Sequence, residues 1–184
     1  MFRRSNLKVL RFLGTVYVNL FRNTPLLVQA YILYFGLTFI INLDSLSAAL
    51  VSLTINNGGY MTEIVRAGME GIHRNEIEAS YALGMSHVQA LRYILIPHAL
   101  RIVYLPTVNQ FLLLVLGSSV LALIGLPELT FQARKIEAYT FRAFEVYITS
   151  MIAYVLLAAL STILLRAIGW RFYRGRKGIL GRRR

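Results

Sequence analysis

The sequence has 184 residues, of which 57% are hydrophobic and 15% are charged, and its mean hydropathy is +0.57. A single soluble domain must cover itself with polar groups, so this composition excludes one and indicates a membrane protein. The chain has no cysteine, which excludes disulfides and thiolate metal sites. Its net charge of +12 would suit nucleic acid, but the basic residues gather beside apolar segments. That placement favours topology signals and contacts with anionic lipid.

Long apolar stretches recur along the chain. A helix needs about 20 apolar residues to cross the ~30 Å hydrocarbon core of a bilayer. A membrane barrel would instead show strands of about 10 residues with alternating polarity, and these stretches do not alternate. We therefore expect one all-α domain, a polytopic membrane helical bundle over residues 1–184. The predicted spans cover residues 23–43, 45–66, 102–126 and 146–166.

The distribution of basic residues orients these spans. Five Arg and Lys side chains lie in residues 1–22 and eight in residues 166–184, and neither segment holds an acidic residue. Basic residues near a span resist translocation, so both ends of the chain are expected in the cytoplasm. Four crossings then place Asp44 outside. The other expected segments are a cytoplasmic loop over 70–101, an external loop over 127–145 and a basic cytoplasmic tail over 167–184.

Within the cytoplasmic loop, residues 75–84 predict a short helix that a glycine ends. Asn75 suits the N-cap position, and Glu78 three residues later can reach back to the free N–H of the cap. Gly84 can adopt the left-handed conformation that closes a helix. The first helix is therefore expected to begin at Asn75 and to end at Gly84.

A second helix is predicted directly after that glycine. Ser86 and Gln89 form an S-x-x-Q capping box, and the helix is expected to end or kink near Pro97. Two helices joined at an angle by a tight turn suit the docking of a partner protein. An amphipathic hairpin on the membrane surface is the alternative, but the first helix carries two glutamates and has no basic polar face.

The same loop carries a spaced pattern. The letters EAS at 78–80 are followed after three residues by Gly84, and after nine more by ILIP at 94–97. This spacing resembles the EAA loop of ABC-importer permeases, EAA-x3-G-x9-I-x-LP, with Ser80 at the second alanine and Ile96 at the leucine. Four longer phrases in order are similar to permeases for polar amino acids, of the histidine, glutamine and arginine type. They are RNTPLLVQAYILYFG (22–36), GGYMTEIVRAGMEGI (58–72), ALGMSHVQALRYILIPHALR (82–101) and SSVLALIGLPELT (118–130).

The resemblance implies a function and partners. The chain would be a permease subunit, not an enzyme, of an ATP-driven importer in a bacterial cytoplasmic (inner) membrane. It would pair with a second permease subunit, identical or paralogous, bind ABC ATPase subunits, and receive a polar amino acid from an extracytoplasmic binding protein. The loop would act as a coupling helix seated on the ATPase. The implied ATPase-coupling residues are Glu78, Ala79, Ser80, Tyr81, Leu83 and Gly84.

Two features depart from the family pattern. Permeases of this type usually carry another span before the TPLLVQ segment, so we expect a further membrane helix N-terminal to Met1. The stretch that often reads Lys-Asp-Thr-Ser in relatives reads Leu116-Gly117-Ser118-Ser119 here. Charged residues of that stretch are therefore not carried over to this chain.

Polar side chains inside the spans are candidates for the substrate path. They are costly in a membrane unless they face a partner or a water-filled cavity. Hydrogen bonding between helices is the alternative for each. A further hypothesis is that Gly58 and Gly59 open their helix and expose backbone groups to a zwitterionic substrate, as broken helices do in transporters. The candidates are Gln29, Asn56, Asn57, Asn109, Gln110, Ser118 and Ser119.

Catalytic chemistry is not expected. The three histidines show no H-E-x-x-H arrangement, and no phosphate-cradling G-x-x-x-x-G-K-[ST] occurs, so no catalytic residue, metal or cofactor is assigned and ATP hydrolysis must come from another subunit. A secondary transporter or channel for small polar solutes is the alternative function. Such a protein would typically need intramembrane carboxylates or internal repeats. The uncharged apolar runs carry no carboxylate, and Glu63 lies at the boundary of the second one.

Overall fold

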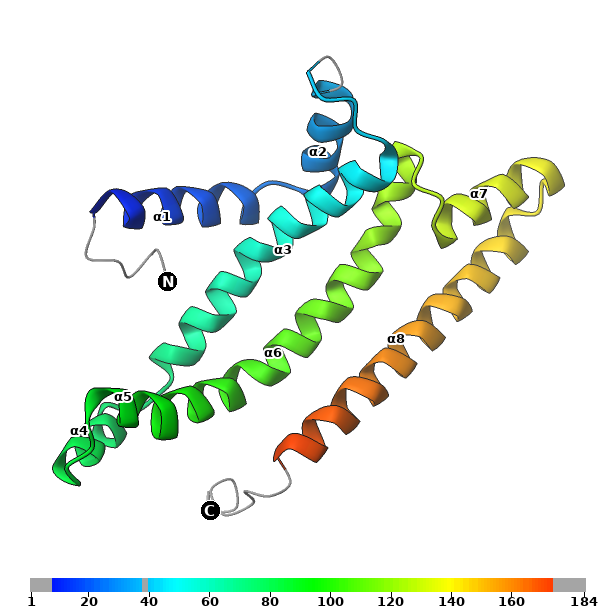
Figure 1. The fold of residues 1–184 in the computed structure, drawn as a ribbon. Helices are drawn as coiled ribbons and strands as arrows, with labels where there is room; N and C mark the ends of the chain where they lie inside the picture. The colour runs from blue at the N-terminus through cyan, green and yellow to red at the C-terminus, as the bar shows by residue number, and fades with distance from the viewer. Residues whose placement is uncertain (1–7, 38–39, 174–184) are drawn as a thin grey trace. The chain divides into compact units, whose positions relative to one another are not determined.

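The computed structural model of the chain describes residues 8–37 and 40–173. These residues are largely helical and hold no β-strand, which confirms the all-α class. Figure 1 labels the helices along the chain. In order, the elements are α1 (Lys8–Arg22), α2 (Leu26–Tyr31), the π-helical η2 (Ile32–Gly36), α3 (Ser45–Glu70), α4 (Arg74–Ala82), α5 (His87–Ala90), the π-helical η3 (Leu91–Leu95), α6 (Ile96–Gly117), the 3₁₀-helical η4 (Ser118–Ile124), α7 (Leu129–Thr140) and α8 (Ala143–Tyr173).

The chain divides into two compact units. The first holds residues 1–63 and 113–158, and the second holds residues 64–112 and 159–184. The long helices α3, α6 and α8 each contribute residues to both units. The segment from α1 to α2 belongs to the first unit, and the loop helices α4 and α5 belong to the second.

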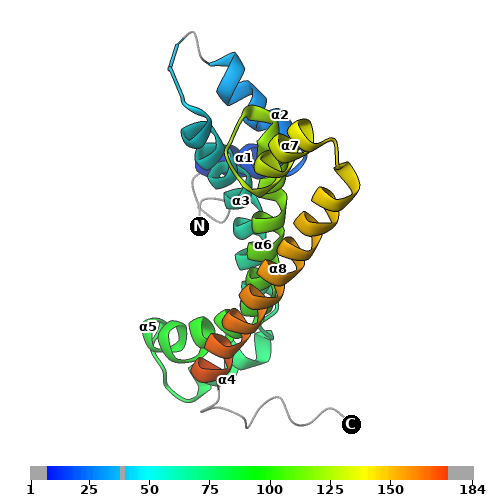
Figure 2. The same cartoon turned by 90° about the vertical axis from the view of Figure 1, so that its right-hand side faces the viewer.

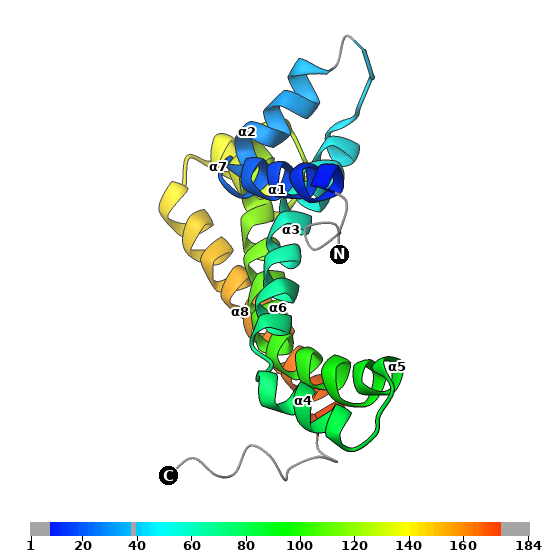
Figure 3. The same ribbon diagram turned by 90° about the vertical axis from the view of Figure 1, so that its left-hand side faces the viewer.

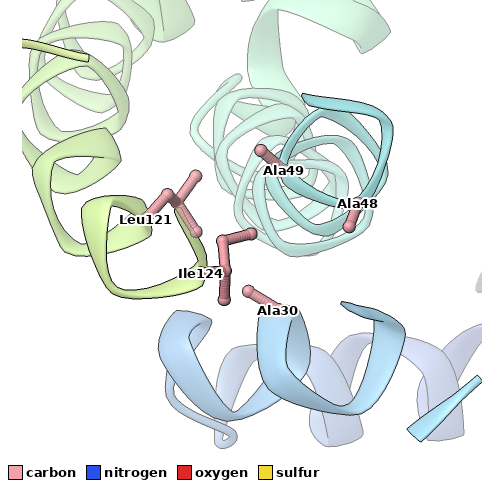
Figure 4. Packing of buried hydrophobic residues seen from close by; sticks show 5 residues of the cluster. All are labelled: Ala30, Ala48, Ala49, Leu121 and Ile124. Carbon is pink, nitrogen blue, oxygen red and sulfur yellow. The ribbon is translucent and has the colours of Figure 1, made fainter. Parts of the chain in front are cut away.

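Small side chains let three elements of the first unit pack closely. Ala30 from α2 and the pair Ala48 and Ala49 from α3 form one buried cluster with two larger side chains of η4. Those two are Leu121 and Ile124, and Figure 4 shows them beside the alanines. Each alanine lets the backbone of its helix approach its neighbour, as is common where membrane helices pack.

The second unit contains the two short helices of the loop. Figures 2 and 3 show α4 and α5 close together where α3 ends and α6 begins. Gly84 has a φ of 76°, which confirms the predicted left-handed turn. The predicted capping box is confirmed too. Ser86 Oγ accepts from Gln89 N at 3.3 Å, and the Gln89 side-chain oxygen accepts from Ser86 N at 2.8 Å.

Within the described residues, two helical stretches are long and apolar enough to cross a membrane. They are His87–Ile124 and Ala143–Arg171, and a shorter apolar helix covers Leu26–Gly36. α3 has 26 residues, which extend about 39 Å at 1.5 Å per residue. Large apolar side chains lie exposed along α8, among them Leu160 and Ile163, as contact with lipid requires. The count of four spans stays a prediction.

Two predicted segments differ in their local structure. Among the described part of residues 23–43, regular helix covers only Leu26–Gly36. The segment over 127–145, expected as a loop, contains the helix α7. Its N-cap is Glu128, whose carboxylate accepts from Phe131 N at 2.7 Å. This side-chain cap favours a helix start that the pattern of apolar residues does not predict. The basic tail lies outside the described residues from position 174 onward.

The predicted start of the first loop helix is wrong. α4 begins at Arg74 with His73 as its N-cap, so Asn75 lies inside the first turn. Glu78 pairs with Arg74, whose Nε is 2.8 Å from Glu78 Oε1, and does not reach back to a cap. Of the two outcomes expected near Pro97, an end or a kink, the end is absent, because helical backbone continues from η3 into α6. Pro97 has no N–H to donate within the helix. The π-helical η3 ends just before it, so the hydrogen-bond pattern changes next to the position where a donor is missing.

Candidate functional site

Large apolar side chains are exposed along the loop helices and η3; besides Tyr93 of η3, which is 60% exposed, four of them follow one another from α4 to the start of η3. Leu83 is 78% exposed and Val88 is 70% exposed, and Tyr81 and Leu91 are each 42% exposed. They come from α4, the Gly84 turn, α5 and the start of η3, and we call them the α4–α5 surface. Apolar groups gathered on a segment between long helices are typical of a protein-binding surface.

A contact across the turn ties α4 to α5. The Tyr81 hydroxyl lies 2.8 Å from His87 Nδ1, and the two rings stack with their centroids 6.4 Å apart. A Cβ at Gly84 would meet no atom within 4 Å, so its left-handed φ, and not crowding, requires glycine there. The turn and the stacked rings together fix Leu83 relative to Val88.

The predicted coupling residues do not all face outward. Ser80 is only 2% exposed, and its hydroxyl donates to Ile77 O at 2.7 Å, so this residue packs within the loop. Sequence reasoning missed Val88 and Leu91, whose i,i+3 spacing after the capping box places them on one helix face. The exposed members of the predicted set are Glu78, Ala79, Tyr81, Leu83 and Gly84.

A break between α1 and α2 gathers two of the predicted substrate-path residues. Gln29 Nε2 donates to Phe21 O and to Thr24 O, both at 2.9 Å. Asn56 Nδ2, from α3, donates to the same Phe21 O at 3.2 Å. The last carbonyls of a helix have no partner within it. Gln29 and Asn56 therefore supply donors at the end of α1, where the chain leaves the helix.

Gly58 and Gly59 do not open their helix, because α3 runs unbroken from Ser45 to Glu70. A Cβ at Gly58 would lie 2.6 Å from the Tyr17 hydroxyl oxygen, and one at Gly59 would lie 3.2 Å from Arg22 Cγ. The two glycines instead let the end of α1 approach α3, and Figure 3 shows α1 lying across α3. The hypothesis of an opened α3 is wrong, and the break lies at residues 23–25.

The other predicted substrate-path residues lie on α3, on α6 and at the start of η4. Ser118 donates to Val115 O and Ser119 to Leu116 O, both at 2.7 Å, so each hydroxyl bonds a carbonyl one turn earlier. Asn57 is half-buried in α3, and Gln110 is half-buried in α6. Gln110 and Asn109 belong to the second unit and the remaining candidates to the first.

Metal ligands do not gather in the part of the chain that the structure describes. No three His, Asp or Glu side chains there are close enough to hold an ion.

Comparison with known proteins decides the family. Residues 2–174 match the model of the binding-protein-dependent transport system inner membrane component family. The chain belongs to this family. The resemblance to permease subunits of polar amino acid ABC importers, first seen in the EAA-like spacing, is thereby confirmed.

Curated relatives resemble this family member over most of its length. The probable glutamine ABC transporter permease protein GlnM of Bacillus subtilis (strain 168) is 38% identical over 151 residues, which are 82% of this chain and 70% of that protein. The glutamine transport system permease protein GlnP of Escherichia coli (strain K12) is 35% identical over 156 residues, covering 83% and 71% respectively.

Solved structures share the fold of this permease. The crystal structure of an amino acid ABC transporter with histidines superposes with a TM-score of 0.85 at 33% identity, covering 92% of this chain and 80% of that one. The MetNI methionine ABC transporter in an inward-facing conformation gives a TM-score of 0.70 at 25% identity, covering 90% and 76%.

Proposed function

We propose that this chain is the membrane-spanning permease subunit of an ATP-driven importer, which translocates a polar amino acid and couples to a separate ATPase through α4 and α5. The α4–α5 surface is the observation that supports this most directly. Its apolar side chains stand exposed on a rigid turn, where a groove on a partner protein would cover them. The relatives named for glutamine and arginine transport support an amino acid as the substrate class.

The proposal includes an orientation in the inner membrane. Both ends of the chain and the loop helices α4 and α5 face the cytoplasm, where the ATPase hydrolyses ATP. The helix α7 faces the other side, where a binding protein delivers the substrate. The asymmetry of basic residues supports this orientation, since the flanks at both ends carry no acidic residue.

Coupling follows from the geometry of the loop. When the ATPase closes on nucleotide, it displaces whatever is seated in its groove. Leu83 and Val88 would be held in that groove, and the Tyr81–His87 contact would make α4 and α5 move together. A second permease subunit would complete the path, with Asn57, Gln110, Ser118 and Ser119 as candidate polar groups along it.

The test is association with the ATPase. We expect Leu83→Asp to abolish copurification of the ATPase under gentle detergent extraction, because a carboxylate in an apolar groove loses its hydration without a partner. Tyr139→Asp is the matched control. Tyr139 is 81% exposed on α7, which the proposed orientation places on the opposite side of the membrane, so this variant should keep the ATPase. Normal copurification with Leu83→Asp, at normal membrane levels, would contradict the proposed docking.

A further inference from the structure

One stretch of α6, residues 98–104, is contacted by three other elements of the second unit. From α4, Glu76 Oε2 lies 2.7 Å from His98 Nδ1. This pair joins the first loop helix directly to the start of the long helix α6. The pair bypasses the Gly84 turn, α5 and η3, which lie between the two helices in the chain. α4 is therefore connected to α6 both through the chain and through this pair.

The end of α3 and the residue that follows it pack against the same stretch through glycines Gly68 and Gly71. A Cβ at Gly68 would lie 2.1 Å from Val103 Cγ1, and one at Gly71 would lie 3.2 Å from Ile102 Cδ1. Gly68 is buried. Valine in a helix has one strongly preferred side-chain rotamer, so Val103 cannot swing away at low cost. The approach of α3 to α6 at this level therefore depends on the missing side chain of Gly68.

α8 contacts the stretch from another direction. A Cβ at Gly169 would lie 2.3 Å from Tyr104 Cε1, and Gly169 is buried. The Tyr104 hydroxyl donates to Leu165 O, one turn earlier on α8. The hydrogen bond holds the ring in place, so the close approach of α8 to α6 depends on glycine as well.

We propose that these contacts form a coupling junction that transmits displacement of α4 and α5 to the long helices as one rigid body. The junction consists of Gly68, Glu76, His98, Val103, Tyr104 and Gly169. It rests on the proposed function, because it needs an ATPase to displace the loop helices. Its members are positioning residues, and none of them is part of the α4–α5 surface.

Without these contacts, the loop helices would be joined to the long helices only through flexible connections. α4 would be joined to α3 only through residues 71–73, and α5 would reach α6 through the π-helical η3, where the helical hydrogen-bond pattern changes. Such connections can bend and absorb a displacement. Close-packed side chains cannot be compressed gradually, so they pass a displacement on to the next helix.

The experiment separates transmission from docking. The chain is purified with its ATPase, reconstituted in liposomes, and assayed for amino acid uptake and ATP hydrolysis together. In Gly68→Ala and Gly169→Ala the added Cβ forces α6 away from α3 or α8. We expect the ATPase to remain associated, and the uptake per ATP hydrolysed to fall at least about fivefold, the low end of typical coupling factors.

Matched variants test the cause. Adding Val103→Ala to Gly68→Ala removes Cγ1 and leaves the nearest remaining atoms, Ala99 O and Val103 Cβ, at 3.5 Å, so uptake per ATP should recover. Gly117→Ala adds the same methyl group to α6 where no atom lies within 4 Å, and it should transport normally. A merely destabilised chain would lower the amount of complex and not the uptake per ATP.

The outcomes distinguish this proposal from the proposed function. If the glycine variants do not reach the membrane, Glu76→Ala decides, because it removes only a half-exposed pair and should lower uptake per ATP with the ATPase still bound. Unchanged uptake per ATP in Glu76→Ala or in the assembled glycine variants would overturn the junction. Loss of the ATPase from Leu83→Asp in the same preparation would then leave the docking function standing.

Discussion

Gln29 and Asn56 donate to one carbonyl oxygen, that of Phe21, from two different helices. Both residues were expected to line a substrate path, and both have their amide nitrogens engaged at the break between α1 and α2. Gln29 is also only 6% exposed. Their geometry favours a role in holding the broken helix together.

Replacing Gln29 by leucine should therefore destabilise the protein. The change removes the Gln29 donor from Thr24 O and one of the two side-chain donors from Phe21 O, which keeps Asn56. A buried group that loses its partner costs about 1–3 kcal/mol. The thermal unfolding midpoint in detergent should fall. Asn56→Leu should lower the midpoint too. The effects of the two changes should not be additive in the double variant, because the two side chains share one acceptor. Gln132→Leu on exposed α7 is the control, and an equal loss there would contradict this role.

Gly84 should tolerate asparagine far better than valine. Its φ of 76° is a conformation that asparagine visits and that a β-branched residue strongly disfavours. Because no atom would crowd a side chain there, the two variants differ only in backbone preference. We expect Gly84→Val to reach the membrane but to lose ATPase association and uptake, and Gly84→Asn to keep most of both. Equal behaviour of the two would contradict a conformational role for the turn.

Single cysteines test the orientation without background, because the chain has none of its own. Lys135→Cys on α7 should react in intact cells with a thiol reagent that cannot cross the membrane. Glu76→Cys on α4 should react only after the membrane is opened. The reversed pattern of labelling would overturn the orientation drawn from the basic flanks.

Asp44 directly precedes α3, and it gives that helix a predictable dependence on acid. Hydrogen bonds from Ser47 lower the pKa of Asp44, and the distance from Ser47 N to Asp44 Oδ1 is 3.4 Å. A pKa below its unfolded value of about 3.9 contributes stability above that pH, which is lost as the pH falls through the folded pKa. Wild type and Asp44→Asn should therefore differ in unfolding midpoint near neutral pH and converge below pH ~3.9. A constant difference down to strong acid would argue against this contribution.

The features that could be predicted from sequence are those set by neighbouring residues. The Gly84 turn and the Ser86–Gln89 capping box depend on a few adjacent positions, and both are confirmed. Asn75 is not the N-cap, because the helix begins two residues earlier than expected, with His73 as its N-cap. The N-cap preference says which residue types suit that position, but it does not say at which residue the helix begins.

The missed features depend on residues far apart in the chain. The Glu76–His98 pair and the Tyr104–Leu165 hydrogen bond join different helices, and no local pattern announces such contacts. Gly58 shows the same limit, because its role depends on Tyr17 from another helix. A glycine beside polar residues suggested an opened helix, whereas the packing partner makes it a site of close approach.

The measurement that tests the account most directly is uptake of a labelled polar amino acid into liposomes that hold the chain with its copurified ATPase, with binding protein outside and ATP inside. We predict uptake that requires ATP, stimulates ATP hydrolysis, and disappears in Leu83→Asp while persisting in Tyr139→Asp. Uptake by the chain alone, without ATPase or ATP, would contradict it and would instead support a secondary transporter or channel.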